Sequence, residues 1–273
     1  MTRIPILLIL TVLVLSGCSK EPVNTGSLFS FRGDTASVMR MATHDTCSLI
    51  ITAEDVVSCF WDFGDGNYSH DFKPVISYHE RGLYSVNLRL MDRKGNITEF
   101  TKKVQVLDRV LKRIGIYVLK WDNDGSNGWP TESTVDIFAT VAHYTDDTMT
   151  QPGIFPNCQV LGSSLVHEDV RRTHPHEVRI LRFNERVVID RNLIKAPADM
   201  EPGNSYLFSL MAIDSNGSVY RLHTNSGTDN TSYPELPGKS FKLTSEDFNL
   251  NISIIQWQVP DRFFCDVVCE FEE

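Results

Sequence analysis

The sequence predicts an all-β protein made of two consecutive β-sandwich domains, and three observations support this. Residues 83–90 alternate between apolar and polar side chains, which is the period of a strand with one buried face. Residues 206–213 are almost continuously apolar, as in a strand buried on both faces. Turn residues recur at short intervals, and helical periodicity is poor throughout. Short strands separated by such turns are typical of β-sandwiches.

The first 17 residues have the pattern of a cleaved export signal. Arg3 supplies a basic charge, and residues 4–15 form an apolar run of 12 residues, which is too short to span a bilayer as a helix. Residues 15–18 (LSGC) resemble the lipobox of bacterial lipoproteins. This resemblance implies cleavage before Cys18, acylation of Cys18 and a membrane as a partner. Residues 18–27 would form a polar tether.

Amino-acid composition indicates what kind of protein follows the tether. The chain has 273 residues, of which 41% are hydrophobic, so the mature part can build a real core. It has 26 basic and 35 acidic side chains and a formal net charge of −9. Nucleic-acid binding needs clustered Lys and Arg, so we expect no nucleic-acid partner.

Cysteine usage leaves the disulfide pattern open. The cysteines that follow Cys18 are Cys47, Cys59, Cys158, Cys265 and Cys269. An exported protein can form disulfides, but this odd number leaves at least one thiol unpaired within a monomer. On a strand, Cys265 and Cys269 would lie about 13 Å apart on one face, beyond disulfide reach. Buried thiols are the expected default.

Residues 28–107 carry the sharpest motifs. Strands are expected at residues 48–52, 59–63, 83–90 and 101–106. The motifs are residues 61–66 (WDFGDG), Tyr78 followed by residues 82–88 (GLYSVNL), and the Asp92–Gly95 turn. This combination resembles the PKD (polycystic kidney disease) domain. The resemblance implies an immunoglobulin-like sandwich that serves as a spacer or interaction module and has no catalytic role.

Residues 108–273 are expected to form a larger β-sandwich with long loops. Its strands are expected at residues 111–121, 135–144, 206–213, 248–259 and 263–271. The sequence from Asp214 to Gly217 repeats the turn from Asp92 to Gly95. Residues 145–199 are the least regular and are expected to form long loops or short inserted strands. The region resembles immunoglobulin- or fibronectin-type sandwiches, and its acidic loops resemble calcium- and lipid-binding sandwiches.

Candidate metal ligands lie mainly in turns of the second region. The candidate calcium ligands are Asp122, Asp124, Asp136 and Asp214. The segment from Asp122 departs from an EF-hand loop, because its sixth residue is not glycine and its twelfth is Ser133. Turn-forming aspartates are the alternative interpretation, which is also favoured for Asp62 and Asp65. Transition-metal ligands could come from His167, His174 and His176, for which solvated surface histidines are the favoured interpretation.

Two tryptophans are candidate ligand-binding residues. Trp121 and Trp129 could stack on a sugar, whereas core or rim packing is the favoured alternative. The chain has no nucleophile elbow, HExxH motif or phosphate-binding glycine loop. We therefore expect a protein that is not an enzyme.

The predicted function follows from three expected parts of the chain. These are the lipid anchor at Cys18, the PKD-like spacer of residues 28–107, and the β domain of residues 108–273, which has no catalytic motif. We expect an outer-membrane lipoprotein that binds an envelope protein or assembles into an envelope machine. Type VI secretion machines, whose outer-membrane lipoproteins use a related sandwich, are one example. Residues 19–22 (SKEP) lack the run of acidic residues that exports some lipoproteins to the surface, which favours the periplasmic face. The alternative is a surface glycan-binding protein or adhesin.

Overall fold

The protein is almost entirely β in its regular structure. The structure is a computed structural model that describes residues 29–31, 38–121, 129–144, 160–172, 178–225, 240–259 and 262–273. Within these ranges the only helical elements are two single 3-10 turns, Arg191–Leu193 and Pro197–Asp199. The predicted fold class is confirmed. In the same ranges, no helix has the length and apolar character needed to cross a membrane.

The first domain consists of two sheets. The smaller sheet contains β1 (Phe29–Phe31), β3 (Thr46–Ile51) and β6 (Val75–Ser77). The larger sheet contains β2 (Val38–Ala42), the first half of β8 (Ile97–Leu119), β7 (Gly82–Asp92), β4 (Val56–Asp62) and β5 (Tyr68–Ser69). Val86, Leu88 and Leu90 of β7 are buried, and the residues between them are exposed. The predicted alternation of this strand is therefore confirmed.

The second domain is also built from two sheets. One contains β12 (Arg179–Val188), the second half of β8, β17 (Phe263–Glu272), β16 (Ile252–Val259) and β15 (Ser240–Asp247). The other contains β10 (Val160–Ser163), β11 (His167–Arg171), β9 (Thr134–His143), β13 (Tyr206–Ile213) and β14 (Val219–Thr224). Seven of the eight residues of β13 are buried, as its apolar sequence predicted.

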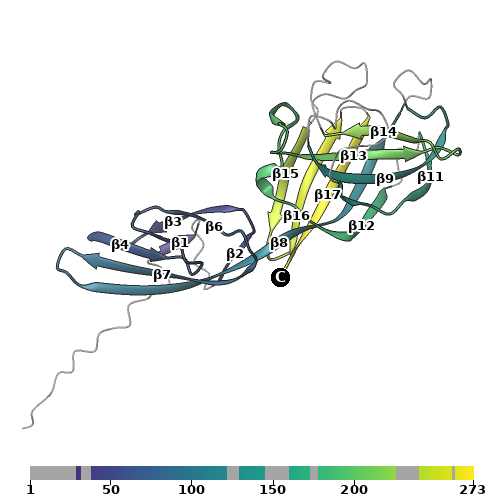
Figure 1. Cartoon of the computed structure of the whole chain (residues 1–273). Coiled ribbons are helices and arrows are strands. Elements are labelled where there is room, and N and C mark those ends of the chain that lie inside the picture. Colours follow the sequence, from purple (N-terminus) through teal and green to yellow (C-terminus); the bar gives the residue numbers. More distant parts are fainter. Residues whose placement is uncertain are drawn as a thin grey trace, which may run out of the picture.

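Strand β8 belongs to both domains. From Ile97 to Val106 it pairs with β7, and from Asp108 to Leu119 it pairs with β17. The change of partner occurs at Leu107, in the middle of a single 23-residue strand. Figure 1 shows β8 leaving the sheet that holds β7 and entering the sheet that holds β16 and β17. The backbone therefore stays extended where one sandwich ends and the next begins.

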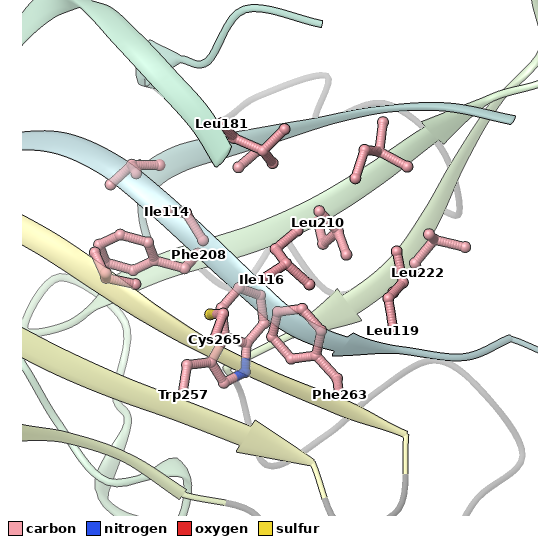
Figure 2. Close-up of a cluster of buried hydrophobic side chains, with 14 of the residues drawn as sticks. Ile114, Ile116, Leu119, Leu181, Phe208, Leu210, Leu222, Trp257, Phe263 and Cys265 are labelled. Atoms are coloured by element: carbon pink, nitrogen blue, oxygen red, sulfur yellow. The ribbon is translucent and has the colours of Figure 1, made fainter. Parts of the chain in front are cut away.

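A single large core lies between the two sheets of the second domain. Trp257 of β16 meets the ring of Phe263 of β17 edge to face, with centroids 4.5 Å apart. Figure 2 shows these rings together with Ile116 of β8 and Phe208 of β13 among the side chains of this core. All four side chains are almost fully buried. Aromatic and branched side chains from both sheets thus fill the sandwich, as close packing requires.

Two predictions for the second domain were wrong in part. The irregular region contains β12, a ten-residue strand of a main sheet rather than an insertion. Its register shifts between Arg182 and Val187, and this bulge interrupts the alternation by which a strand is recognised. In addition, the strand expected from Phe248 begins at Ile252, because residues 248–251 form the turn after β15.

Candidate functional site

Several predicted site residues lie outside the part of the chain that the structure describes. These residues are Cys18, Asp122, Asp124, Cys158, His174 and His176. The lipid anchor and half of the predicted calcium ligands therefore remain predictions from the sequence.

Asp214 is part of a turn rather than a metal cluster. Its Oδ1 accepts the N–H groups of Asn216 and Ser218, at 2.9 and 2.8 Å. Its Oδ2 accepts the hydroxyl of Tyr220 at 2.9 Å. These bonds, with the one from Ser218 as the largest contribution, lower the pKa of Asp214. The turn aspartate interpretation fits this residue.

The same turn occurs in the first domain. Asp92 Oδ1 accepts the N–H groups of Lys94 and Asn96, and Asn96 also donates its side-chain amide to Oδ2. In both turns a glycine with φ near 80° sits three residues after the aspartate, at Gly95 and Gly217. The sequence repeat is thus a repeat of structure, because glycine adopts this φ without steric cost.

The other candidate carboxylates within the described residues also accept backbone hydrogen bonds. Asp136 Oδ1 accepts the N–H of Asp169 at 2.9 Å. Asp62 accepts the N–H of Gly64, and Asp65 accepts the N–H of Asn67, each at 2.9 Å. Across the described ranges, no group of three or more His, Cys, Asp or Glu side chains is placed to hold a metal ion.

The two candidate tryptophans lie in the core of the second domain. Trp121 is 2% exposed and Trp129 is 4% exposed. Trp121 Nε1 donates to the carbonyl of Glu132 at 3.4 Å, and the guanidinium of Arg262 lies 5.4 Å from the Trp129 ring centroid. Neither ring offers an open face to a sugar, and both contribute to core packing.

The four described cysteines are free thiols in buried positions. Burial raises the pKa of Cys269 to about 12 and that of Cys265 well above its ordinary value. Thiols are nucleophilic and metal-binding only as thiolates, so burial disfavours reaction at these two residues.

A buried polar cluster lies where the two domains meet. Arg109, in the middle of β8, is fully buried. Its Nη2 donates to both carboxylate oxygens of Asp45, at 3.3 and 3.1 Å, and to Glu246. Its Nη1 donates to the carbonyl of Ile189 at 3.3 Å. Asp45 belongs to the first domain and Glu246 and Ile189 to the second, so one side chain bonds to both. We call this cluster the domain joint.

Further contacts surround the domain joint. The carboxylate of Asp108 accepts the hydroxyl of Thr43 at 3.2 Å and the guanidinium of Arg186 at 2.5 Å. At the surface, the exposed Arg191 donates to the second carboxylate oxygen of Glu246 at 3.1 Å. A small apolar cluster seals one side, in which Ala42 of β2, Leu107 of β8 and Phe271 of β17 pack with Phe248.

Burial and charge pairing act against each other in the domain joint, and they decide the pKa of Asp45 and of Arg109 differently. Burial raises the pKa of Asp45 above the ordinary 3.8, because desolvation together with nearby Glu246 outweighs the attraction of Arg109. Burial alone would lower the pKa of Arg109, but the Asp45 and Glu246 carboxylates raise it. The guanidinium therefore stays charged. This arrangement fixes the position of one domain against the other through Asp45, Arg109 and Glu246.

The domain joint was not predicted from the sequence. Its one local signal is a charged pair, Asp108 and Arg109, inside an otherwise apolar stretch of β8. Charged residues in the middle of a buried strand need partners. Those partners lie 64 and 137 residues away, at Asp45 and Glu246, and no local pattern identifies them.

An open row of rings lies on the outer face of the first domain. The centroid of Phe60 on β4 lies 6.0 Å from that of Tyr68 on β5 and 5.3 Å from that of His70. Tyr68 is 70% exposed and Phe60 is 38% exposed. Phe60 is the register partner of Arg89, which pairs with Glu99 at 3.6 Å. Exposed rings beside polar groups form the kind of surface that binding proteins use.

Comparisons with known proteins identify the first domain. Residues 34–107 match the family model of the PKD domain. The chain is 30% identical over 95 residues to the pre-pro-metalloprotease PrtV of Vibrio cholerae, which covers 35% of this chain and 10% of that protein. It spans a tenth or less of the curated relatives it matches.

The chain is also similar to several solved structures. The PKD1 domain of Vibrio anguillarum Epp is 32% identical and covers 29% of this chain and 87% of its own, with a TM-score of 0.23. A carbohydrate-binding module of the β-sandwich superfamily is 11% identical and covers 71% of this chain and 96% of its own, with a TM-score of 0.25. Residues 34–107 of this chain are a PKD domain, and a second, larger β-sandwich follows it.

Proposed function

We propose that this protein is a non-enzymatic, lipid-anchored binding protein of the cell envelope. The PKD domain would hold the second sandwich at a fixed position relative to the membrane. The observation that carries the proposal is the continuous strand β8 together with the domain joint, since both oppose movement between the domains. The export-signal pattern before Cys18 supports the anchor.

The chemistry of the described residues supports a role in binding rather than catalysis. The carboxylate of Asp45 is engaged in an ion pair with Arg109, and those of Asp62 and Asp214 in turn hydrogen bonds. The thiols of Cys265 and Cys269 are fully buried. A rigid scaffold with its polar groups engaged in this way is suited to presenting a surface.

Affinity capture from native membranes tests the role. The full lipidated chain carrying a C-terminal tag is expected to recover envelope proteins after mild crosslinking. A Cys18→Ser variant, which cannot be acylated, is the control and should recover far fewer of them. Recovery of secretion-machine components would support the narrower role in a type VI apparatus. Equal recovery by both variants, or no envelope protein at all, would contradict the proposal.

Protease treatment of intact cells tests the proposed location. We expect the periplasmic face of the outer membrane, so the chain should survive proteolysis until the outer membrane is permeabilised. A periplasmic protein is the control for leakage. Digestion in intact cells would contradict this location and favour a surface protein.

A second candidate function is the binding of a surface carbohydrate, favoured by the exposed ring row of Phe60, Tyr68 and His70. Tyr68→Ala is expected to weaken retention on the bound polysaccharide in an affinity gel by tenfold or more. Leu83→Ala is the matched control, because Leu83 is 61% exposed on the same sheet in another register row. Equal retention of both variants would exclude the ring row as the binding surface.

A further inference from the structure

Two histidines of the PKD domain approach each other closely. His44 lies in the turn between β2 and β3, and His79 lies between β6 and β7. Their Nδ1 atoms are 3.1 Å apart, and their ring planes are inclined by 63°. The backbone fixes this approach, because the N–H of His44 donates to the carbonyl of Tyr78 at 2.8 Å. His44 also has a φ of 64°, which sets the direction of its side chain.

The distance between the two Nδ1 atoms suits a shared metal ion. Zinc binds imidazole nitrogen at about 2.0–2.1 Å, so two nitrogens on one tetrahedral ion lie about 3.3 Å apart. Without a metal, the same contact requires one imidazole to donate and the other to accept, and two protonated rings would place two donors face to face. A metal ion instead accepts both lone pairs at once.

We propose that His44 and His79 form a two-histidine site for a divalent transition metal. In the described ranges no third His, Cys, Asp or Glu joins them, so water or a ligand from another molecule would fill the remaining positions. Imidazole nitrogen selects copper, nickel and zinc over calcium and magnesium, and copper binds most tightly in this series. His79 is exposed, so an ion can reach the site from solvent.

The site adjoins the contact between the domains. The carbonyl of His44 accepts the side-chain amide of Asn192, a residue of the second domain, at 2.8 Å. The next residue is Asp45, which pairs with Arg109. A metal that binds only the folded protein raises its free energy of unfolding by RT ln(1 + [L]/Kd), where [L] is the free metal concentration and Kd its dissociation constant. Metal binding at His44 is therefore coupled to the turn that forms the domain joint.

Calorimetric titration of the full chain with CuCl2 and with ZnCl2 tests the proposal. A His174→Ala/His176→Ala background removes the two histidines that lie outside the described residues. In this background we expect one bound ion per chain, with copper tighter than zinc and no binding of CaCl2. His79→Gln and His44→Asn should each weaken copper binding tenfold or more. Asparagine is chosen at residue 44 because it tolerates a positive φ.

A matched control and a spectroscopic measurement make the outcome decisive. His70→Gln changes another PKD histidine, whose Nδ1 faces the carbonyl of Cys59 at 3.1 Å, and should leave copper affinity unchanged. Electron paramagnetic resonance of the copper complex should show two coordinated nitrogens, and fewer in the His79→Gln variant. Unchanged affinity in His79→Gln, or no binding in the background chain, would overturn the proposal. Circular dichroism confirms that each variant is folded.

Discussion

The two sandwiches of this molecule have the same architecture but are encoded differently. The PKD domain is specified by short motifs, such as the Asp62–Asp65 loop, whose carboxylates bond to backbone two residues away. The second domain relies on a large apolar core, whose members come from strands far apart in the sequence. Turns can be predicted from residues that are close in the sequence. Core contacts cannot, because they join residues that come together only in the folded chain. The domain joint makes the two depend on each other.

Two single variants, each lacking one core tryptophan, test whether the domains unfold together. They have the largest expected effect on stability. Trp61 and Trp257 are fully buried, in the first and second core respectively. Trp→Ala in a core costs about 3–5 kcal/mol. Because β8 and the domain joint couple the domains, each variant should keep one calorimetric transition at a lower temperature. A transition that stays at the wild-type temperature in either variant would show that the domains unfold independently. Leu250→Ala, at a residue that is 74% exposed, is the control.

Removing the central cation of the domain joint is expected to have the next largest effect. Arg109→Met leaves Asp45 buried without its cation, and breaking a buried ion pair costs about 3–5 kcal/mol. We expect the lower end, because Glu246 keeps its contact with Arg191. The variant should separate the single melting transition into two. Arg40→Ala, which removes an exposed contact to the carbonyl of Phe248, should change stability by less than about 0.5 kcal/mol. Equal effects of both variants would contradict a central role for Arg109.

The repeated turns allow the same substitution to be made in both domains, with the smallest expected effect on stability. Asp92→Ala and Asp214→Ala should lower the melting temperature by similar amounts, since each loses the same pair of backbone bonds. The pKa of each carboxyl is lower in the folded chain than its ordinary 3.8. Their stabilisation is therefore complete above pH 3.8 and disappears as the pH falls through the lowered folded pKa. Melting curves from pH 7 to pH 2 should show the variants converging on wild type in acid. A pH-independent difference would show that the carboxylate charge is not what stabilises the turn.

The sequence predicts those parts of the fold that depend on neighbouring residues. The alternation of β7 and the turns at Asp92 and Asp214 follow from local pattern, and the structure confirms them. Strand β12 was missed because its bulge disrupts the alternation between Arg182 and Val187.

The candidate sites were harder to predict, because burial and long-range pairing decide them. Trp121 and Trp129 have the same side chain whether they pack in a core or stack on a sugar, and only their burial assigns them to the core. The approach of His44 to His79 joins two turns that are 35 residues apart. Arg109 bonds to Asp45 and Glu246, which are 64 and 137 residues away in the sequence. Each of these contacts exists only through tertiary structure.

The continuity of β8 also has a mechanical consequence. A flexible linker between domains lengthens under tension and absorbs displacement before either domain is loaded. Here the passage between the sandwiches is already extended and hydrogen-bonded on both sides of Leu107, so it has no slack. A pull on one sandwich is transmitted directly to the strands of the other. A force applied to the second domain would therefore act on the first domain without any prior lengthening of the connection between them.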